Sequence, residues 1–175
     1  MVLDTSRLLL RCWRDADHDA LAAMHADPEV MYDYGGPISR AESGAKLDRY
    51  AAAFHRHGIC RWAVEDRIAH FLGYVGVMPS NPGPLEPHME IGWRLKRSAW
   101  SHGYATEAAQ AALADAFDRV RLNEVLAYTG PANLRSQAVM VRPRLQRDSA
   151  RDFTSHYGGI GAWRGWVWVA RPLNP

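Results

Sequence analysis

The chain has 175 residues, of which 47% are hydrophobic, and a formal net charge of +2 from 21 Lys and Arg against 19 Asp and Glu. This length and apolar content suit a globular domain with a sizeable core. The scattered charges form no basic patch for nucleic acid, and no stretch approaches the roughly 18 apolar residues of a membrane span. The N-terminus, MVLDTSRLLL, carries an acidic residue and no long apolar stretch, so no signal peptide is recognised and the expected location is the cytoplasm.

The chain has two cysteines, Cys12 and Cys60. One pair has neither the number nor the spacing of a disulfide framework or a metal site, so no metal is expected. Both cysteines lie in strand-like segments, which favours buried free thiols.

The first third of the chain predicts one strand followed by two helices. Residues 7–13 (RLLLRCW) are strand-like, and the segment DADHDALAAMHAD predicts a helix with one of its first two aspartates as the N-cap. A second helix is expected to begin at Ser39, because Glu42 stands three residues later in the spacing of a capping box. Gly58 is placed to end this helix.

Three strands are predicted in the middle of the chain, at residues 59–65, 71–78 and 88–95. A short polar turn separates the first two, and a loop rich in Pro and Gly precedes the third. The third strand has a clear period of two, in which four large apolar residues alternate with His88, Glu90, a glycine and an arginine. The apolar residues are Met89, Ile91, Trp93 and Leu95.

The strongest periodic signal lies in the second half of the chain. Apolar residues recur at helical spacing over residues 105–120, which predicts a long helix with an Ala-rich face. A strand is expected at residues 122–129, then a short helix at residues 133–142 with Asn133 as its N-cap, and a last strand at residues 165–171. The complete pattern predicts a mixed α/β sheet of six or seven strands with four helices.

A turn of mostly small residues, residues 101–105 (SHGYA), stands directly before the long helix. Such a turn presents unpaired backbone N–H groups and the positive end of the helix dipole, which suits a phosphate or pyrophosphate. The alternative is an ordinary strand-to-helix connection, since every helix start has these amides. No Gly-Lys-Ser/Thr follows, and the Gly-x-Gly-x-x-Gly pattern is absent, so neither a Walker loop nor a dinucleotide fingerprint is present.

Four segments carry a family resemblance: RLLLRCWRDAD, EIGWRL, WSHGYATEA and RLNEVLAYTGPANLRSQAVM. In this order they resemble the GNAT acyltransferase superfamily, and more closely its branch of ribosomal-protein N-terminal (RimJ/RimL-type) acetyltransferases, over roughly residues 5–150. The resemblance implies one acyl-CoA N-acyltransferase domain over residues 1–175. Its α/β (α+β) fold would be a GNAT-type mixed, mostly antiparallel twisted sheet with a V-shaped splay between two central parallel strands.

The resemblance also implies that acetyl-CoA is the co-substrate and lies in the opening between residues 88–95 and 122–129. Backbone amides of the turn would hold the pyrophosphate, main-chain groups of residues 93–95 the pantetheine arm and the acetyl carbonyl, and Asn133 the pantetheine. Arg97 would pair with a phosphate, or else be a solvated surface arginine. The residues expected at the cofactor are Trp93, Arg94, Leu95, Arg97, Ser101, His102, Gly103, Tyr104, Ala105 and Asn133.

Acetyl transfer to an amine needs a base for the amine, donors for the oxyanion and an acid for the departing thiolate. Glu90 and His88 project to one face of their strand, and either would serve as the base, directly or through water. The alternatives are a structural hydrogen bond for Glu90 and a surface position for His88. The resemblance places Ser136 near the thioester sulfur as the acid, and the alternative is an ordinary helix-surface serine. Many superfamily members have a tyrosine where this chain has Met140.

The chain departs from the superfamily pattern at two places. Ser101 stands at a glycine position of the turn, where a positive φ or a close phosphate would cost about 1 kcal/mol and reduce CoA affinity. After Met140, a Pro143–Arg144 pair replaces the usual Leu and Gly, so the helix is expected to end at Arg142 and to be frayed or redirected.

Three hypotheses follow from the sequence. The first is an acetyl-CoA-dependent N-acetyltransferase acting on a primary amine, either a protein N-terminus or a small molecule such as an antibiotic, polyamine or amino acid. The second is an acyl-CoA-binding protein with little turnover, and the third is a purely structural domain. Neither nucleic acid nor membrane is expected as a partner, and the relatives' habit of dimerising makes a homodimer a candidate assembly.

Overall fold

The computed structural model describes residues 1–80, 84–157 and 161–172. In this part of the chain nine strands form a sheet in the order β1-β2-β3-β4-β5-β6-β9-β7, and β8 pairs with β9. The strands are β1 (Val2–Asp4), β2 (Leu8–Arg11), β3 (Arg61–Asp66), β4 (Phe71–Ser80), β5 (His88–Leu95), β6 (Val125–Thr129), β7 (Gln146–Arg147), β8 (Phe153–Tyr157) and β9 (Gly161–Ala170). The α-helices are α1 (Asp17–His25), α2 (Arg40–His57), α3 (Tyr104–Asp118) and α4 (Leu134–Val141).

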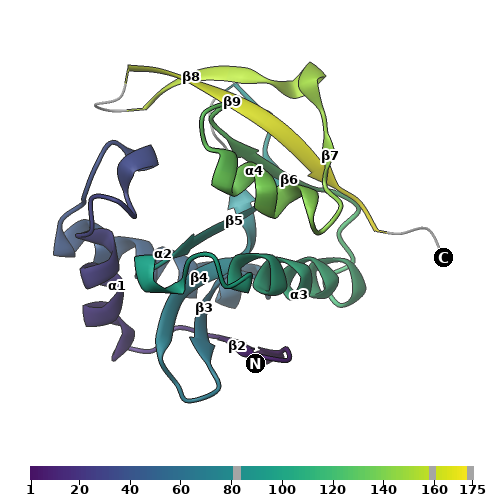
Figure 1. The fold of residues 1–175 in the computed structure, drawn as a ribbon. Helices are drawn as coiled ribbons and strands as arrows, with labels where there is room; N and C mark the ends of the chain where they lie inside the picture. The colour runs from purple at the N-terminus through teal and green to yellow at the C-terminus, as the bar shows by residue number, and fades with distance from the viewer. Residues whose placement is uncertain (81–83, 158–160, 173–175) are drawn as a thin grey trace.

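Figure 1 shows α1 and α2 side by side, α3 crossing the middle strands, and α4 beside β6 under the long β8–β9 hairpin. Every predicted helix and strand is present, and β5 has the predicted bounds. Nine described strands replace the six or seven expected, because β1, β7 and β8 were not predicted. The first two have only three and two residues, too few for a periodic signal.

The one parallel pair among the described strands is β5 with β6, and the structure joins them at a single register position, Glu90 opposite Leu126. All other paired strands are antiparallel. β5 continues five residues past that position to Leu95 without a partner on this side. The sheet therefore splays open at the carboxyl end of β5, as the family resemblance implied.

The helix ends follow local chemistry at most of the predicted positions. Ser39 and Glu42 form the capping box of α2, and Gly58 ends this helix with φ 67°. The N-cap of α1 is Ala16, so the prediction of an aspartate there is wrong. Asp17 lies in the first turn instead, where its carboxylate accepts the backbone N–H of Arg14. It also binds the Arg11 guanidinium, which explains why its side chain is unavailable as a cap.

The end of α4 is closed rather than frayed. The backbone N–H of Leu145 donates to the carbonyl of Met140 at 3.1 Å, and that of Arg144 donates to Val141 at 3.1 Å. This pair of bonds is the Schellman motif, which places its C′ residue in the left-handed region. Arg144 takes this place with φ 66°, where the family usually has glycine.

Of the two cysteines, Cys60 is buried and Cys12 is half-buried, and both are free thiols. Burial raises the pKa of the Cys60 thiol, which keeps it protonated and unreactive. No helix in the described ranges is long and apolar enough to cross a membrane.

Candidate active site

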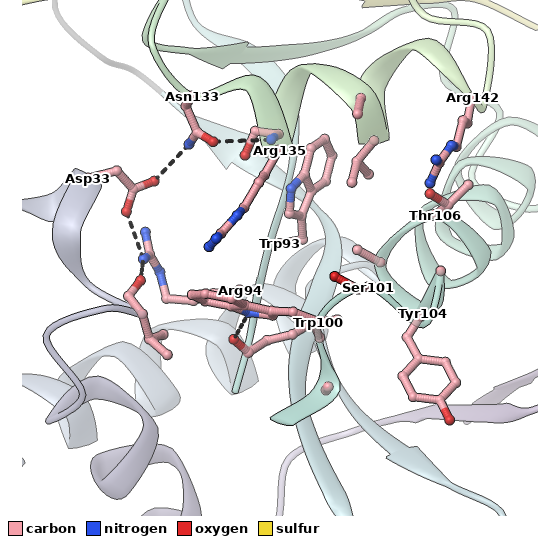
Figure 2. Close-up of a pocket in the computed structure, with 18 of the residues that line it drawn as sticks. Asp33, Trp93, Arg94, Trp100, Ser101, Tyr104, Thr106, Asn133, Arg135 and Arg142 are labelled. Carbon is pink, nitrogen blue, oxygen red and sulfur yellow. Dashed lines mark hydrogen bonds and ion pairs between the residues drawn. The ribbon is translucent and has the colours of Figure 1, made fainter. Parts of the chain in front are cut away.

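A cavity of about 410 Å³ opens at the splay of the sheet. Four segments line it: the connection after α1 around residues 30–33, the end of β5, the turn that begins α3, and the inner face of α4. Figure 2 shows their side chains converging on the same space. Of the residues expected at the cofactor, Trp93, Arg94, Leu95, Ser101, Gly103, Tyr104, Ala105 and Asn133 line this cavity.

The start of α3 presents uncapped amides to the cavity. Its N-cap is Gly103, with φ 78° and no side-chain cap, whereas Ser39 caps α2 and Asn133 caps α4. The first N–H groups of a helix have no partner within the helix, so they are available to a ligand. Ser101, two residues earlier, has φ 64°, so the departure from glycine does place a side chain in the left-handed region.

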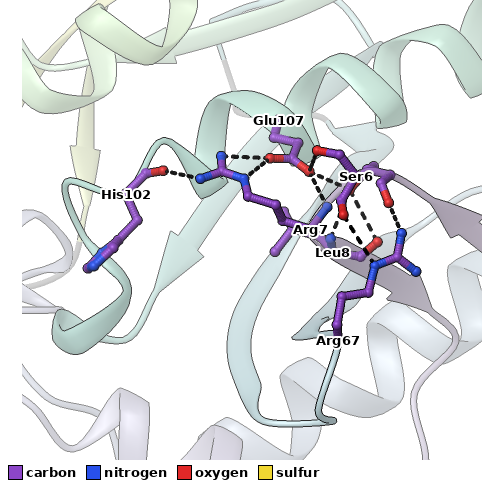
Figure 3. A network of polar contacts seen from close by, with 7 residues as sticks. Ser6, Arg7, Leu8, Arg67, His102 and Glu107 are labelled. Atoms are coloured by element: carbon purple, nitrogen blue, oxygen red, sulfur yellow. Dashed lines mark hydrogen bonds and ion pairs between the residues drawn. The ribbon is translucent and has the colours of Figure 1, made fainter.

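A polar cluster fixes this helix start from outside the cavity (Figure 3). Glu107, in the first turn of α3, accepts from the Thr5 and Ser6 hydroxyls and from the backbone and side chain of Arg7. Arg7 also donates to the carbonyl of His102 at 2.9 Å. Burial opposes ionisation of Glu107, but these hydrogen bonds outweigh it and lower its pKa to about 2. The carboxylate is thus committed to holding the turn.

The remaining two residues expected at the cofactor lie outside the cavity. The His102 ring is exposed, stacks on Tyr104 with centroids 5.4 Å apart, and has its Nδ1 2.6 Å from the carbonyl of Trp100. Arg97 pairs with Glu29 on the surface and is 59% exposed. The surface alternative therefore describes the side chain of Arg97 in this structure.

Two other arginines, which sequence reasoning missed, line the cavity. Arg135 lies over the ring of Trp100, with its guanidinium carbon 4.5 Å from the centroid, and Arg142 lies near Thr106 (Figure 2). Arg135 in α4 and Arg142 at its C-cap are seven residues apart, about two helical turns, so they lie on one face of the helix. In the sequence, this seven-residue spacing after the N-cap Asn133 is the signal that would have identified the two arginines.

Ser136 lines the cavity one turn into α4. Its backbone N–H donates to Oδ1 of Asn133 at 3.1 Å, which confirms Asn133 as the predicted N-cap. Met140 is buried, so the position that is often tyrosine in the superfamily serves the core here.

The two candidate bases stand on the same strand but do not line the cavity. Glu90 is 18% exposed and bonds to the Arg61 guanidinium at 2.9 Å and to the Tyr128 hydroxyl at 2.8 Å. Arg61 is itself buried and occupies the space beside Gly92, where a Cβ would lie 2.7 Å from its Nη1. The structure thus contains the hydrogen bonds that the sequence raised as the alternative for Glu90.

His88 is half-buried, with Nδ1 2.8 Å from the carbonyl of Glu86 and its ring edge-on to Tyr128 at 5.8 Å. Its Nε2 is buried and has no hydrogen-bond partner among the residues that the structure describes. His88 is therefore a half-buried residue at the start of β5, close to the surface position considered for it, and it is not among the residues that line the cavity.

An aspartate that the sequence did not single out lies at the opposite end of the cavity. Asp33, on the short 3₁₀ turn η1 (Tyr32–Tyr34), accepts from Arg94 at 2.8 Å and from Asn133 at 3.3 Å. Burial works against the charge of Arg94, but Tyr74 and Asp33 raise its pKa. Asp33 thus connects the loop before α2 to both sides of the splay.

The described residues include no group of three or more His, Cys, Asp and Glu side chains that would hold a metal ion. The cavity offers backbone amides, an amide side chain and three guanidinium groups, of which that of Arg94 is paired with Asp33. This donor set suits an anionic, amide-containing ligand.

Comparison with known proteins adds to this geometry. The model of the acetyltransferase (GNAT) domain family matches residues 7–146. The uncharacterized N-acetyltransferase YnaD of Bacillus subtilis (strain 168) is 37% identical over 152 residues, covering 85% of this chain and 84% of that protein.

Solved structures share the fold. An acetyltransferase of Agrobacterium tumefaciens str. C58 superposes with a TM-score of 0.84 at 25% identity, over 98% of this chain and 95% of that one. The ribosomal L7/L12 α-N-protein acetyltransferase RimL, solved in complex with coenzyme A, superposes with a TM-score of 0.77 at 14% identity, over 98% of both chains.

Proposed function

Since this chain belongs to the GNAT acetyltransferase family, we propose that it is an acetyl-CoA-dependent N-acetyltransferase that transfers the acetyl group to a primary amine by direct attack on the thioester. The observation that carries the proposal is the uncapped start of α3, which opens into the cavity at the splay. Uncapped helix amides favour a pyrophosphate there. The single residue pair that joins β5 and β6 leaves the strand edges beyond it available to a pantetheine arm.

The cavity fits the cofactor by its chemistry. The amides of the turn and the guanidinium groups of Arg135 and Arg142 would hold the phosphates. Backbone groups of residues 93–95 and the Asn133 side chain would bind the amide groups of pantetheine. Acetyl-CoA supplies the activated acyl group, and the protein supplies orientation, proton transfer and donors for the oxyanion.

In the transfer, the amine nitrogen forms a bond to the acetyl carbon, and the C–S bond then breaks to release a thiolate. Glu90 takes the amine proton through a water molecule, because its carboxylate is already bonded to Arg61 and Tyr128. His88, with its buried Nε2, is the second candidate base. The hydroxyl of Ser136 gives a proton to the departing sulfur and takes one back from water, while Glu90 returns the amine proton to water, so that the products are the amide and the free thiol.

The electrostatics of the site favour an acceptor with a single amine over a polyamine. Glu90 is neutralised by Arg61 and Asp33 by Arg94, so neither carboxylate adds net negative charge. A polycation gains most from uncompensated carboxylates. We therefore propose a peptide N-terminus or a small monoamine as the acceptor.

One observation favours a second candidate, an acyl-CoA-binding protein with little turnover. The ion pair and hydrogen bond that hold Glu90 commit the first candidate base to structure. Substitution separates the two functions. Glu90→Gln and Ser136→Ala should each lower the rate at least tenfold, about 1.4 kcal/mol of barrier, if these residues take part in the chemistry. Unchanged rates in both variants would reject these roles.

The first experiment is thermal unfolding with acetyl-CoA, using AMP as a control. At a hundredfold excess over Kd, binding adds about 2.7 kcal/mol, or a Tm increase of about 5–10 °C for a chain of this size. A panel of peptide N-termini, monoamines and polyamines, read out by free thiol release, then tests turnover. A Tm increase without thiol release from any amine would favour the binding protein, and no increase at millimolar acetyl-CoA would reject both functions.

The remaining expectations stay predictions. They are one acyltransferase domain over residues 1–175, a cytoplasmic location, no metal, no nucleic-acid or membrane partner, and a homodimer as a candidate assembly.

A further inference from the structure

A continuous set of hydrogen bonds crosses the open end of the splay (Figure 2). Arg94, on β5, donates from Nη1 to Oδ1 of Asp33 at 2.8 Å. Asn133, four residues after the end of β6, donates from Nδ2 to Oδ2 of the same carboxylate at 3.3 Å. The Oδ1 of Asn133 accepts the backbone N–H of Ser136 at 3.1 Å. One carboxylate therefore joins the β5 side of the opening to the start of α4.

These hydrogen bonds lie at a level of the splay where the structure records no pairing between β5 and β6. The structure pairs β5 with β6 only at Glu90 and Leu126, and Arg94 lies four residues beyond that position. The Asp33 side chain is 31% exposed, the Arg94 side chain 15%, and Asn133 is buried. The 2.8 Å bond between Arg94 and Asp33 has the length of a strong charge-assisted hydrogen bond, and the bond from Asn133, at 3.3 Å, is longer. They are well suited to fix the separation between β5 and α4.

Asp33 also belongs to the connection between α1 and α2. It lies between two exposed residues, Tyr32 and Tyr34, on the turn that connects α1 to α2. Arg94 donates to the carbonyl of Val30 as well, so the same guanidinium anchors this turn twice. A change at the turn is thereby transmitted to the N-cap of the helix that carries Ser136.

We propose that Asp33 is a positioning residue for acetyl transfer: it fixes the separation between β5 and α4 and, through Asn133, orients the first turn of α4 with Ser136. This role rests on the proposed function for its kinetic consequence, but not for its structural one. The competing role is direct, with the Asp33 charge anchoring the acceptor ammonium. A carboxylate has about four acceptor sites and two are used here, so geometry alone allows that role as well.

An exchange of the two side chains tests the contact, and the kinetics of Asp33→Asn separate the two roles. Asp33→Asn places an amide N–H₂ opposite the amide of Asn133, and Asn133→Asp places two carboxylates opposite each other, so each single change breaks the bond. In the double variant, the amide at position 33 donates to the carboxylate at position 133. Its carbonyl oxygen still accepts from Arg94, and aspartate remains a good N-cap. The contact is restored while the charge leaves position 33.

The structural arm uses no ligand. Each single variant should lower the Tm, and the double variant should return it to within about 2 °C of the parent, as expected for a coupled pair. Asp19→Asn is the matched control, because Asp19 pairs with Arg40 on the exposed surface. It should leave both the Tm and the rate within error of the parent.

The kinetic arm uses acetyl-CoA and the best amine of the panel. At saturating acetyl-CoA, Asp33→Asn should lower kcat at least tenfold and change the KM for the amine less than threefold. The double variant is compared by its Tm alone, because Asn133 is also a proposed ligand of pantetheine. A KM for the amine raised at least tenfold in Asp33→Asn, with kcat within threefold of the parent, would overturn the proposal, because the charge at position 33 would then bind the acceptor directly. Single variants that behave like the parent in both arms would overturn it as well. If the parent turns over no amine, the proposed function fails, and the Tm cycle alone still tests the contact.

Discussion

Replacing Ser101 with glycine should stabilise the protein. Ser101 has φ 64°, which costs an L-residue about 1–2 kcal/mol. Glycine removes this cost but adds about 0.4–1 kcal/mol of chain entropy to the unfolded state, so the net gain is about 0.5–1 kcal/mol. In a chain of 175 residues that corresponds to a Tm increase of about 1–4 °C, measured by calorimetry without ligand.

The same reasoning predicts little change in cofactor affinity. Because Arg7 and Glu107 hold this turn from outside the cavity, we expect Ser101 to keep its positive φ with and without the cofactor, so that the strain cancels from the binding free energy. The Kd of acetyl-CoA should therefore change less than about threefold, against the reduced affinity expected from the sequence. Ser101→Ala is the control, because it removes the hydroxyl but keeps the Cβ and the strain. A glycine variant no more stable than the alanine variant would refute the strain argument, and tenfold tighter binding would refute the cancellation.

Two further predictions concern stability. Arg144→Gly should raise the Tm by about 1–4 °C, because Arg144 occupies the C′ position of α4 with φ 66°. Arg144→Ala keeps the Cβ and should not raise the Tm. Equal Tm values for the two variants would contradict this reasoning. His25 is fully buried beside Ser43, and burial, with Lys46 and Arg94 nearby, lowers its pKa to about 4. The contribution of the neutral His25 ring to the free energy of unfolding is complete above 6.5, the pKa of the unfolded state. It is lost as the pH falls, by about 3 kcal/mol at pH 4. His25→Gln should make the free energy of unfolding depend less on pH between pH 6.5 and 4. Denaturant unfolding measured across this range would reject the prediction if the free energy of the variant fell as steeply with pH as that of the parent.

Features that depend on neighbours in the sequence could be predicted. The capping box of Ser39 and Glu42, the terminator Gly58 and the N-cap Asn133 all arise from contacts within a few residues. The alternation that defined β5 is equally local. Such signals place the elements, and the family resemblance then supplies their arrangement around the splay.

Features that depend on distant partners could not be predicted. Asp33 and Asn133 are 100 residues apart in the chain, and Arg61 and Glu90 are 29 apart. Nothing in the segment around Asp33 distinguishes it from other surface aspartates before the fold brings it to Arg94. The expected cofactor ligand Arg97 illustrates the reverse case, since proximity along the chain placed it next to the turn while Glu29 holds its side chain on the surface.

The two departures from the family pattern therefore bear on stability more than on the site. Ser101 and Arg144 both adopt the positive φ that glycine would have taken, so the turn before α3 and the end of α4 keep their backbone course. The cavity lies between these two segments and retains its uncapped amides, Asn133 and Ser136. The positive φ of Ser101 and Arg144 is therefore expected to lower the stability of the fold, while the amides at the start of α3 remain able to bind acetyl-CoA.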